Sequence, residues 1–243
     1  MRLIIAKFGG TSVANEDARN CAVSRIRQLR DEGNTVVAVV SAMGRKGAPY
    51  ATDTLLGLVD DGASARTRDL LMSCGETISA CVFSQALIRA GIASKPMCAL
   101  TAGIQSDGNY GSAELVSMNY CKVTQAIAEG FVPVITGFQG VADGEINTLG
   151  RGGSDSSAAC IGAFMHADEV QIYTDVDGVY TDDPRSNPNA VRIPRISCDD
   201  MTAMALNGAK VIHPRAVIAA KASKIPLRVL SVFTPDEGTL IAD

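Results

Sequence analysis

The sequence lacks the cysteine and histidine patterns that hold metal ions or build catalytic triads. Its seven cysteines form no C-x-x-C pair and have no zinc-ligand spacing. Its two histidines have ordinary structural explanations: His166 ends a predicted helix and His213 precedes Pro214. No serine, histidine and acid form a nucleophilic arrangement. We therefore expect reduced thiols in the core of a cytoplasmic protein, and we assign neither histidine a catalytic role.

The chain also lacks an excess of positive charge and a long hydrophobic segment. Its net charge of −4 argues against nucleic acid or an anionic membrane as the main partner. The apolar run at residues 3–6 is too short for a signal peptide, and we expect no run of membrane-spanning length. The 243 residues, 47% hydrophobic and 20% charged, suffice for a sizeable core. No repeat or linker divides them, so one unit over 1–243 is the simplest organisation.

Two common nucleotide fingerprints are missing. No G-x-x-x-x-G-K-[ST] occurs, so the chain has no P-loop. The segment from Gly150 to Asp155 has an aspartate where G-x-G-x-x-G needs its last glycine. Phosphate binding, if present, uses another fold.

Apolar strands alternate with helical segments, which predicts an α/β sandwich with a mainly parallel sheet. The predicted strands are 3–8, 35–40, 94–100, 132–136, 169–173, 227–232 and 239–241, with a hairpin at Asp143-Gly144. The predicted helices are 15–31, 53–60, 67–90, 113–129, 154–165, 201–206 and 214–222. The pattern allows two lobes, about 1–135 and 136–243.

Two glycine turns are candidates for binding an anion. In the segment 148–159, three glycines with Arg151 and Asp155 precede an alanine-rich helix, whose first N–H groups favour negative charge. Arg151 adds a bidentate grip for carboxylate or phosphate. Lys7 stands just before Gly9 and Gly10, where it can reach phosphate oxygens over the turn while the N–H groups of the two glycines cradle them. The alternatives are a capped structural turn and a surface lysine.

The acidic segment 173–185 follows an apolar strand, where α/β sheets bind ligands. Asp175 suits ribose or base, Tyr180 suits stacking on adenine, and Arg185 suits phosphate. Lys210 supplies a second cation for phosphates. The alternatives are an acidic surface loop and an ordinary lysine at a helix end.

Glu76 precedes an apolar helical stretch and suits a substrate ammonium group. The alternative is that Glu76 is an acidic residue in the first turn of a helix, where the helix dipole stabilises negative charge.

Eight segments, in order along nearly the whole chain, resemble the successive motifs of the aspartate kinase family. They are K-F-G-G-T-S-V (7–13), V-S-A-M-G (40–44), S-C-G-E (73–76), T-G-F-Q-G (136–140), T-L-G-R-G-G-S-D (148–155), 173–185, G-A-K-V-I-H-P-R-A (208–216) and G-T-L-I (238–241). The resemblance implies the amino acid kinase fold, a three-layer αβα sandwich around a mainly parallel sheet.

The resemblance also implies transfer of the γ-phosphoryl group of ATP to the side-chain carboxylate of L-aspartate. That reaction begins lysine, threonine, methionine and diaminopimelate biosynthesis. It implies that Lys7, Asp155 and Lys210 are catalytic, with Mg²⁺ carried by the nucleotide and no metal site on the protein. The implied nucleotide residues are Lys7, Phe8, Gly9, Gly10, Thr174, Asp175, Tyr180, Arg185 and Lys210. The implied acid-binding residues are Ser41, Thr52, Glu76, Arg151 and Gly152.

Members of that family usually continue past G-T-L-I into ACT regulatory domains. We therefore expect a catalytic domain without them, working as a homodimer or with a separate regulatory subunit. Two alternatives stay open: a kinase of the same fold that acts on another acid, such as glutamate or N-acetylglutamate, and a non-catalytic nucleotide-binding subunit.

Overall fold

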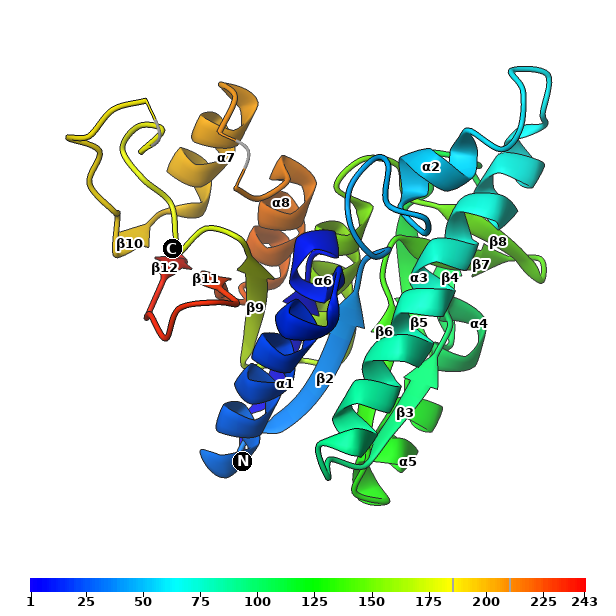
Figure 1. Cartoon of the computed structure of the whole chain (residues 1–243), viewed down its shortest axis with the longest axis horizontal. Coiled ribbons are helices and arrows are strands. Elements are labelled where there is room, and N and C mark those ends of the chain that lie inside the picture. Colours follow the sequence, from blue (N-terminus) through cyan, green and yellow to red (C-terminus); the bar gives the residue numbers. More distant parts are fainter. Residues whose placement is uncertain (185, 210) are drawn as a thin grey trace.

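A computed structural model describes residues 1–184, 186–209 and 211–243. Its large sheet has eight strands in the order β10-β12-β11-β9-β1-β2-β6-β3 (Figure 1). Neighbouring strands pair in parallel, except that β11 and β12 are antiparallel. The strands are β1 Leu3–Phe8, β2 Thr35–Val40, β3 Ser94–Met97, β6 Val132–Thr136, β9 Glu169–Thr174, β10 Arg195–Ile196, β11 Leu227–Ser231 and β12 Thr239–Ile241. The sheet takes strands from both halves of the chain.

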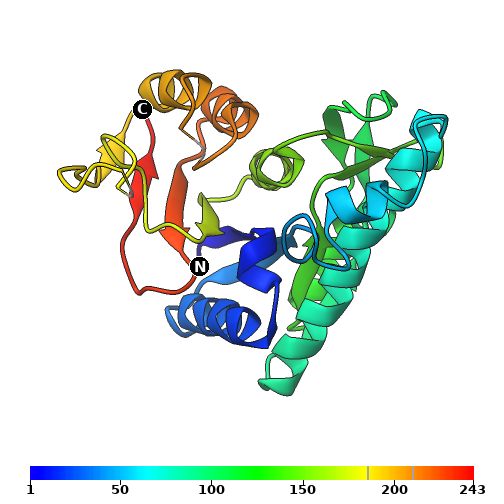
Figure 2. The same cartoon turned by 45° about the horizontal axis from the view of Figure 1, so that its top comes forward.

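Helices cover both faces of this sheet, as Figure 2 shows. The helices are α1 Glu16–Asp31, α2 Thr52–Leu56, α3 Ala65–Arg89, α4 Ala99–Ala102, α5 Cys121–Ala128, α6 Gly153–Phe164, α7 Cys198–Leu206 and α8 Pro214–Ser223, with a 3₁₀ helix at Gly10–Val13. One core layer joins the sheet to α1 and α3, through side chains such as Ile26 and Phe83. The other joins it to α6, α7 and α8, through Ile161 and Val217. The predicted three-layer αβα sandwich is confirmed.

The centre of the sheet explains where a site can form. In β2, five consecutive apolar residues, 36–40, are fully buried, as expected for a strand covered on both faces. The register pairs Phe8 with Val40, so β1 and β2 end at the same edge. The glycine turn after Phe8 and the loop after Val40 therefore lie side by side.

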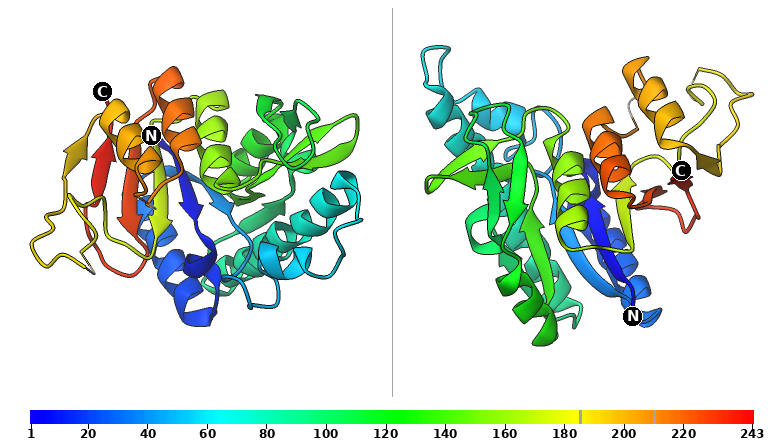
Figure 3. Two further views of the ribbon diagram at one scale, coloured as in Figure 1. Left: turned by 90° about the horizontal axis from the view of Figure 1, so that it is seen from above. Right: turned by 180° about the vertical axis from the view of Figure 1, so that it is seen from behind.

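A small second sheet, β5-β4-β7-β8, lies at the end of the molecule away from β10 and β12 (Figure 3). Its strands are β4 Ile104–Ser106, β5 Leu115–Met118, β7 Gln139–Ala142 and β8 Glu145–Thr148. The predicted hairpin is confirmed: β7 and β8 are antiparallel, and Asp143 and Gly144 have φ of 51° and 79°.

The predicted helix 113–129 is wrong in its first half. Residues Leu115–Met118 form β5, which pairs with β4, and the helix begins only at Cys121. The alanine and glutamate at 113–114 favour a helix locally, but pairing with the neighbouring strand decides the structure. The predicted strand 94–100 likewise ends at Met97 and is followed by α4.

The expectation that most cysteines are core residues is also wrong. All seven are free thiols, but only Cys198 is buried, and Cys74, Cys81 and Cys121 are exposed. Small or apolar neighbours in the sequence did not reveal which face of a helix a cysteine occupies.

Helix α3 is long and apolar enough, by length and composition alone, to cross a membrane. The expectation that no segment reaches that length is therefore wrong. Half of its apolar window is buried within the fold, and the helix packs against β2, β3 and β6. Such packing is typical of a core helix.

Candidate functional site

A cavity of about 230 Å³ lies at the carboxyl ends of β1 and β2. Its lining comes from the turn after β1, the loop after β2, α2, α3 and the start of α6. The lining residues are Lys7, Gly10, Ser41, Ala42, Gly44, Thr52, Glu76, Gly152, Gly153, Ser154 and Asp155. Ligands of open α/β sheets bind at this edge. The two predicted glycine turns, whose glycines Gly10 and Gly150 are 140 positions apart in the sequence, therefore line one cavity.

Lys7 and Asp155 form the charged centre of this cavity. The Lys7 Nζ lies 2.6 Å from the Asp155 Oδ1, and both side chains are largely buried. The contact is a close ion pair in a largely buried setting. The other oxygen, Oδ2, accepts from the backbone N–H of His213 at 3.3 Å. The carboxylate thus holds the ammonium group of Lys7 at the mouth of the glycine turn.

Glu76 is the buried acid of the cavity. Its side chain comes from the middle of α3 and is 2% exposed. Oε1 accepts from the backbone N–H of Ala42 at 3.0 Å, whereas Oε2 has no partner among the described residues. Burial raises the pKa of the Glu76 carboxyl to about 8, against a smaller opposite effect of the Ala42 bond. An incoming cation would satisfy Oε2 and favour the ionised form.

Glycines let the walls of the cavity approach one another. A Cβ on Gly10 would stand 2.5 Å from the Gly44 carbonyl oxygen and 2.7 Å from that of Ala42. A Cβ on Gly75 would stand 2.8 Å from the carbonyl oxygen of Tyr50, which lets α3 cross close to the loop after β2. Gly152 has φ of 72° and packs against the His213 ring. Only glycine fits these close approaches.

The structure brings most predicted acid-side residues together. Ser41, Thr52, Glu76 and Gly152 all line the cavity. Arg151 is exposed and is not among the lining residues, although the next residue is.

Of the residues predicted at the first glycine turn, Phe8 and Gly9 are engaged within the fold and Gly10 lines the cavity. Phe8 is fully buried and stacks on Tyr173 with ring centroids 4.9 Å apart, so only its backbone faces the turn. The Gly9 N–H donates to the Tyr173 carbonyl at 3.2 Å. Of the two predicted phosphate-binding amides, the Gly9 amide is thus engaged within the fold, and Gly10 lines the cavity.

The predicted nucleotide wall stands at the same edge, beyond β9. Strand β9 pairs in parallel with β1, with Tyr173 opposite Phe8. Thr174, the residue after Tyr173, therefore lies beside Gly9, whose N–H donates to the Tyr173 carbonyl. Asp175 forms an ion pair of 2.7 Å with Arg45 from the loop after β2. Both side chains are exposed, so this pair is weak.

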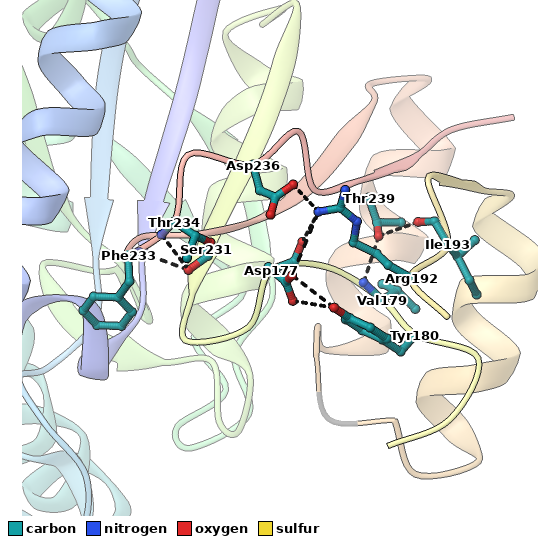
Figure 4. Close-up of polar contacts among 10 residues, drawn as sticks. All are labelled: Asp177, Val179, Tyr180, Arg192, Ile193, Ser231, Phe233, Thr234, Asp236 and Thr239. Atoms are coloured by element: carbon teal, nitrogen blue, oxygen red, sulfur yellow. Dashed lines mark hydrogen bonds and ion pairs between the residues drawn. The ribbon is translucent and has the colours of Figure 1, made fainter. Parts of the chain in front are cut away.

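Tyr180 is held by an acidic neighbour rather than left free (Figure 4). Its hydroxyl donates to both carboxylate oxygens of Asp177 at 3.0 Å. Burial, and then the Asp177 carboxylate, raise the pKa of this phenol. Arg192 lies between Asp177 and Asp236 and pairs with both. The wall is therefore a network of partly exposed, mutually paired groups.

Two predicted residues, Arg185 and Lys210, lie outside the described residues. Within the ranges that the structure describes, no three His, Cys, Asp or Glu side chains form a group able to hold a metal ion.

A larger cavity, of about 490 Å³, lies between α1 and the strands β9 and β11. The arginines in its lining are already bonded: Arg228 contacts Glu169 at 3.0 Å, and the Nε of Arg25 donates to the Val232 carbonyl. It contains neither glycine turn nor the Lys7–Asp155 pair. We therefore place the functional site at the smaller cavity.

The sequence analysis missed three residues that shape the site. Asp69 is buried and bonds to the start of the second glycine turn. Arg45 reaches the β9 end, and His213 packs on Gly152. An aspartate in a helical run gives no sign of burial, but the position of His213 beside Pro214, at the start of a helix, was available as a signal.

The protein is a three-layer α/β sandwich in which a lysine and two glycine turns line one cavity at the carboxyl ends of the strands. The chain belongs to the amino acid kinase family, whose model matches residues 2–231. It is similar to aspartokinase 1 of Bacillus subtilis strain 168, with 44% identity covering 99% of this chain and 61% of that protein.

Solved aspartate kinases have the same fold. The Synechocystis enzyme matches with a TM-score of 0.85 and 38% identity, over 98% of this chain and 40% of its own. Escherichia coli aspartokinase III, solved in complex with aspartate and ADP, matches with a TM-score of 0.84 and 28% identity, over 99% and 64%. The chain spans about three fifths of the length of the curated relatives it matches.

Proposed function

We propose that this protein is an aspartate kinase, which transfers the γ-phosphoryl group of MgATP to the side-chain carboxylate of L-aspartate and gives 4-phospho-L-aspartate. This reaction is the entry to lysine, threonine, methionine and diaminopimelate biosynthesis. The similarity to aspartokinases over the whole chain supports the proposal.

The observation that carries the substrate assignment is the unpartnered Oε2 of Glu76. A buried carboxylate oxygen without a donor is costly, and an α-ammonium group is the ligand that removes this cost. A free amino acid supplies that group, whereas an N-acylated acid does not. Arg151 would then hold the α-carboxylate, and Ser41, Thr52 and Gly152 would line the pocket.

Phosphoryl transfer to a carboxylate requires positioning and charge neutralisation rather than a protein nucleophile. The acceptor is already ionised, so no general base is needed. In this proposal Lys7 neutralises the charge that develops between the two anions, and Asp155 holds Lys7 in place. The amide of Gly10 and the start of α6 face the same anions.

Nucleotide binding is proposed at the β9 edge. Thr174, Asp175, Tyr180 and Arg185 would form the wall for the nucleoside, and Lys210 would add a second cation. Mg²⁺ carried by the phosphates would neutralise their charge. Aspartokinase III, solved with aspartate and ADP, supports this assignment of ligands.

The same proposal extends to the roles of the two parts of the chain, to the location of the enzyme and to its assembly. Residues 1–135 would supply most of the acid side and 136–243 the nucleotide side of one catalytic unit. We propose a cytoplasmic enzyme that forms a homodimer or binds a separate regulatory subunit.

The proposal is tested by hydroxamate formation with MgATP and a panel of L-aspartate, L-glutamate, N-acetylglutamate and no acceptor. We expect a signal that depends on L-aspartate. A signal with another acid instead would keep the chemistry and overturn the substrate. No signal with any acid, together with measurable ATP binding, would favour the non-catalytic subunit.

A further inference from the structure

Asp69 is a buried acid that the proposed reaction does not use. Its side chain is 1% exposed, and three donors surround its carboxylate. Oδ2 accepts from the backbone N–H of Thr148 at 2.7 Å and from that of Gly111 at 2.9 Å, and Oδ1 accepts from the Thr148 hydroxyl at 2.7 Å. All three donors are neutral, so the carboxylate works as a fixed set of acceptors.

Asp69 and Glu76 belong to the same face of α3. Glu76 follows Asp69 by seven positions, and seven residues make almost two full helical turns. The two side chains therefore leave the helix in nearly the same direction, about 10 Å apart along its axis. One rigid helix therefore presents Glu76 to the cavity and Asp69 to the segment that leads into the second glycine turn.

That segment is held from the other side as well. Leu149 follows Thr148 and precedes Gly150-Arg151, and its carbonyl accepts from Arg215 Nη1 at 2.6 Å. Arg215 belongs to α8, which packs against α6. Asp69 thus joins the turn that carries Arg151 to α3, the helix that carries Glu76. Arg215 joins the same turn to α8, on the proposed phosphate side of the site.

We propose that Asp69 is a positioning residue that sets the distance between Glu76 and Arg151, and thereby the fit of the amino acid. The inference rests on the proposed function, in which these two residues hold the α-ammonium and α-carboxylate groups. Because binding of both groups at once needs one fixed separation, loosening the Arg151 turn weakens aspartate binding more than MgATP binding.

The test compares Asp69→Ala with Asp69→Asn by steady-state hydroxamate kinetics. Alanine removes all three contacts. Asparagine keeps them, because its oxygen can accept from both N–H groups while its amide donates to the Thr148 hydroxyl, which can also accept. We expect Asp69→Ala to raise the aspartate KM about 10-fold or more and to change the ATP KM less than about 2-fold. We expect Asp69→Asn to stay within about 3-fold of the wild type for both.

A milder variant and a control separate positioning from folding. Thr148→Val removes only the hydroxyl contact, so it remains informative if Asp69→Ala does not fold, and it should raise the aspartate KM alone. Ser84→Ala breaks the buried Ser84–Ser94 hydrogen bond of 2.9 Å at the far end of α3 and should lower the Tm with both KM values unchanged.

An unchanged aspartate KM in both Asp69→Ala and Thr148→Val, or equal increases in the two KM values, would overturn the inference. Loss of activity in Asp69→Asn as large as in Asp69→Ala would also overturn it, because charge rather than position would then matter. If the wild type forms no hydroxamate with L-aspartate, the proposed function fails instead. If Glu76→Gln raises the aspartate KM while the Asp69 and Thr148 variants do not, only the inference fails.

Discussion

The proposed acid side and the proposed nucleotide side of the site are built in opposite ways. On the acid side, Glu76 and Asp69 are buried in the fold, and α3 holds both. On the nucleotide side, Asp175 is exposed, and Tyr180 is bonded to its neighbour Asp177. The buried part of the acid side offers fixed groups in a water-poor setting, and the nucleotide side offers partly exposed groups that are already paired with one another.

This difference indicates where specificity arises. Buried charges with fixed partners interact strongly and are costly to leave unpaired, whereas exposed pairs contribute little. The acid side should therefore select its ligand sharply, and single substitutions there should have large effects. The nucleotide side should tolerate substitution, because water can replace a lost contact.

The largest expected effect lies where the two sides meet. Lys7→Ala removes the cation paired with Asp155 and should lower kcat by on the order of 10²–10³, as loss of a charge-stabilising donor does. Steady-state kinetics of purified, folded protein measure it. Near-normal turnover would show that Lys7 has no part in neutralising the transferring phosphoryl group.

Arg151→Ala should affect the two substrates unequally. Losing a charged hydrogen bond to the α-carboxylate should raise the aspartate KM about 10- to 100-fold, with a smaller change for ATP. An increase in the ATP KM alone would mean that Arg151 binds the nucleotide and not the amino acid, which would contradict its place on the acid side.

Glu76→Gln should stabilise the ligand-free protein in a pH-dependent way. The folded state holds the carboxyl proton up to about pH 8, whereas the unfolded chain releases it near 4.5. Between these values the folded state binds more protons, so the free energy of unfolding falls as pH rises, by on the order of a few kcal/mol. Glutamine lacks this titration. Its Tm advantage over wild type should be larger at pH 8.5 than at pH 5, and thermal unfolding at both pH values measures it; an equal difference would mean that Glu76 is already ionised.

Tyr180→Phe should have the smallest effect. It removes the hydroxyl that bonds to Asp177 but keeps the ring, so the ATP KM should change less than about 3-fold. A much larger increase would mean that the nucleotide side is as finely fixed as the acid side.

Features that depend on local sequence patterns were predicted correctly, and features that depend on distant contacts were not. Strands β1 and β2 were predicted with their observed bounds, because runs of buried apolar residues leave few alternatives. The lysine and the glycine turns were also recognisable, since glycine at such density has few other uses. Residues 113–118 were misassigned because their pairing with β4 is a contact that no local pattern encodes.

The parts of the site that depend on the tertiary structure could not be predicted. Nothing in the sequence around Asp69 distinguishes it from a solvated helix residue, and its partners Gly111 and Thr148 lie far along the chain. The Gly9 amide was expected to be free for phosphate, but only the neighbouring strand β9 supplies its acceptor. Which oxygen of Glu76 lacks a partner is likewise a property of the packed structure.

The central claim is that the buried Glu76 carboxylate receives the α-ammonium group of the acceptor. The most direct measurement compares hydroxamate kcat/KM for L-aspartate and for succinate, which lacks only that ammonium group, in the wild type and in Glu76→Gln. The account predicts a preference for aspartate of about 100-fold or more in the wild type, which largely disappears in the variant. An equal preference in both proteins would contradict it.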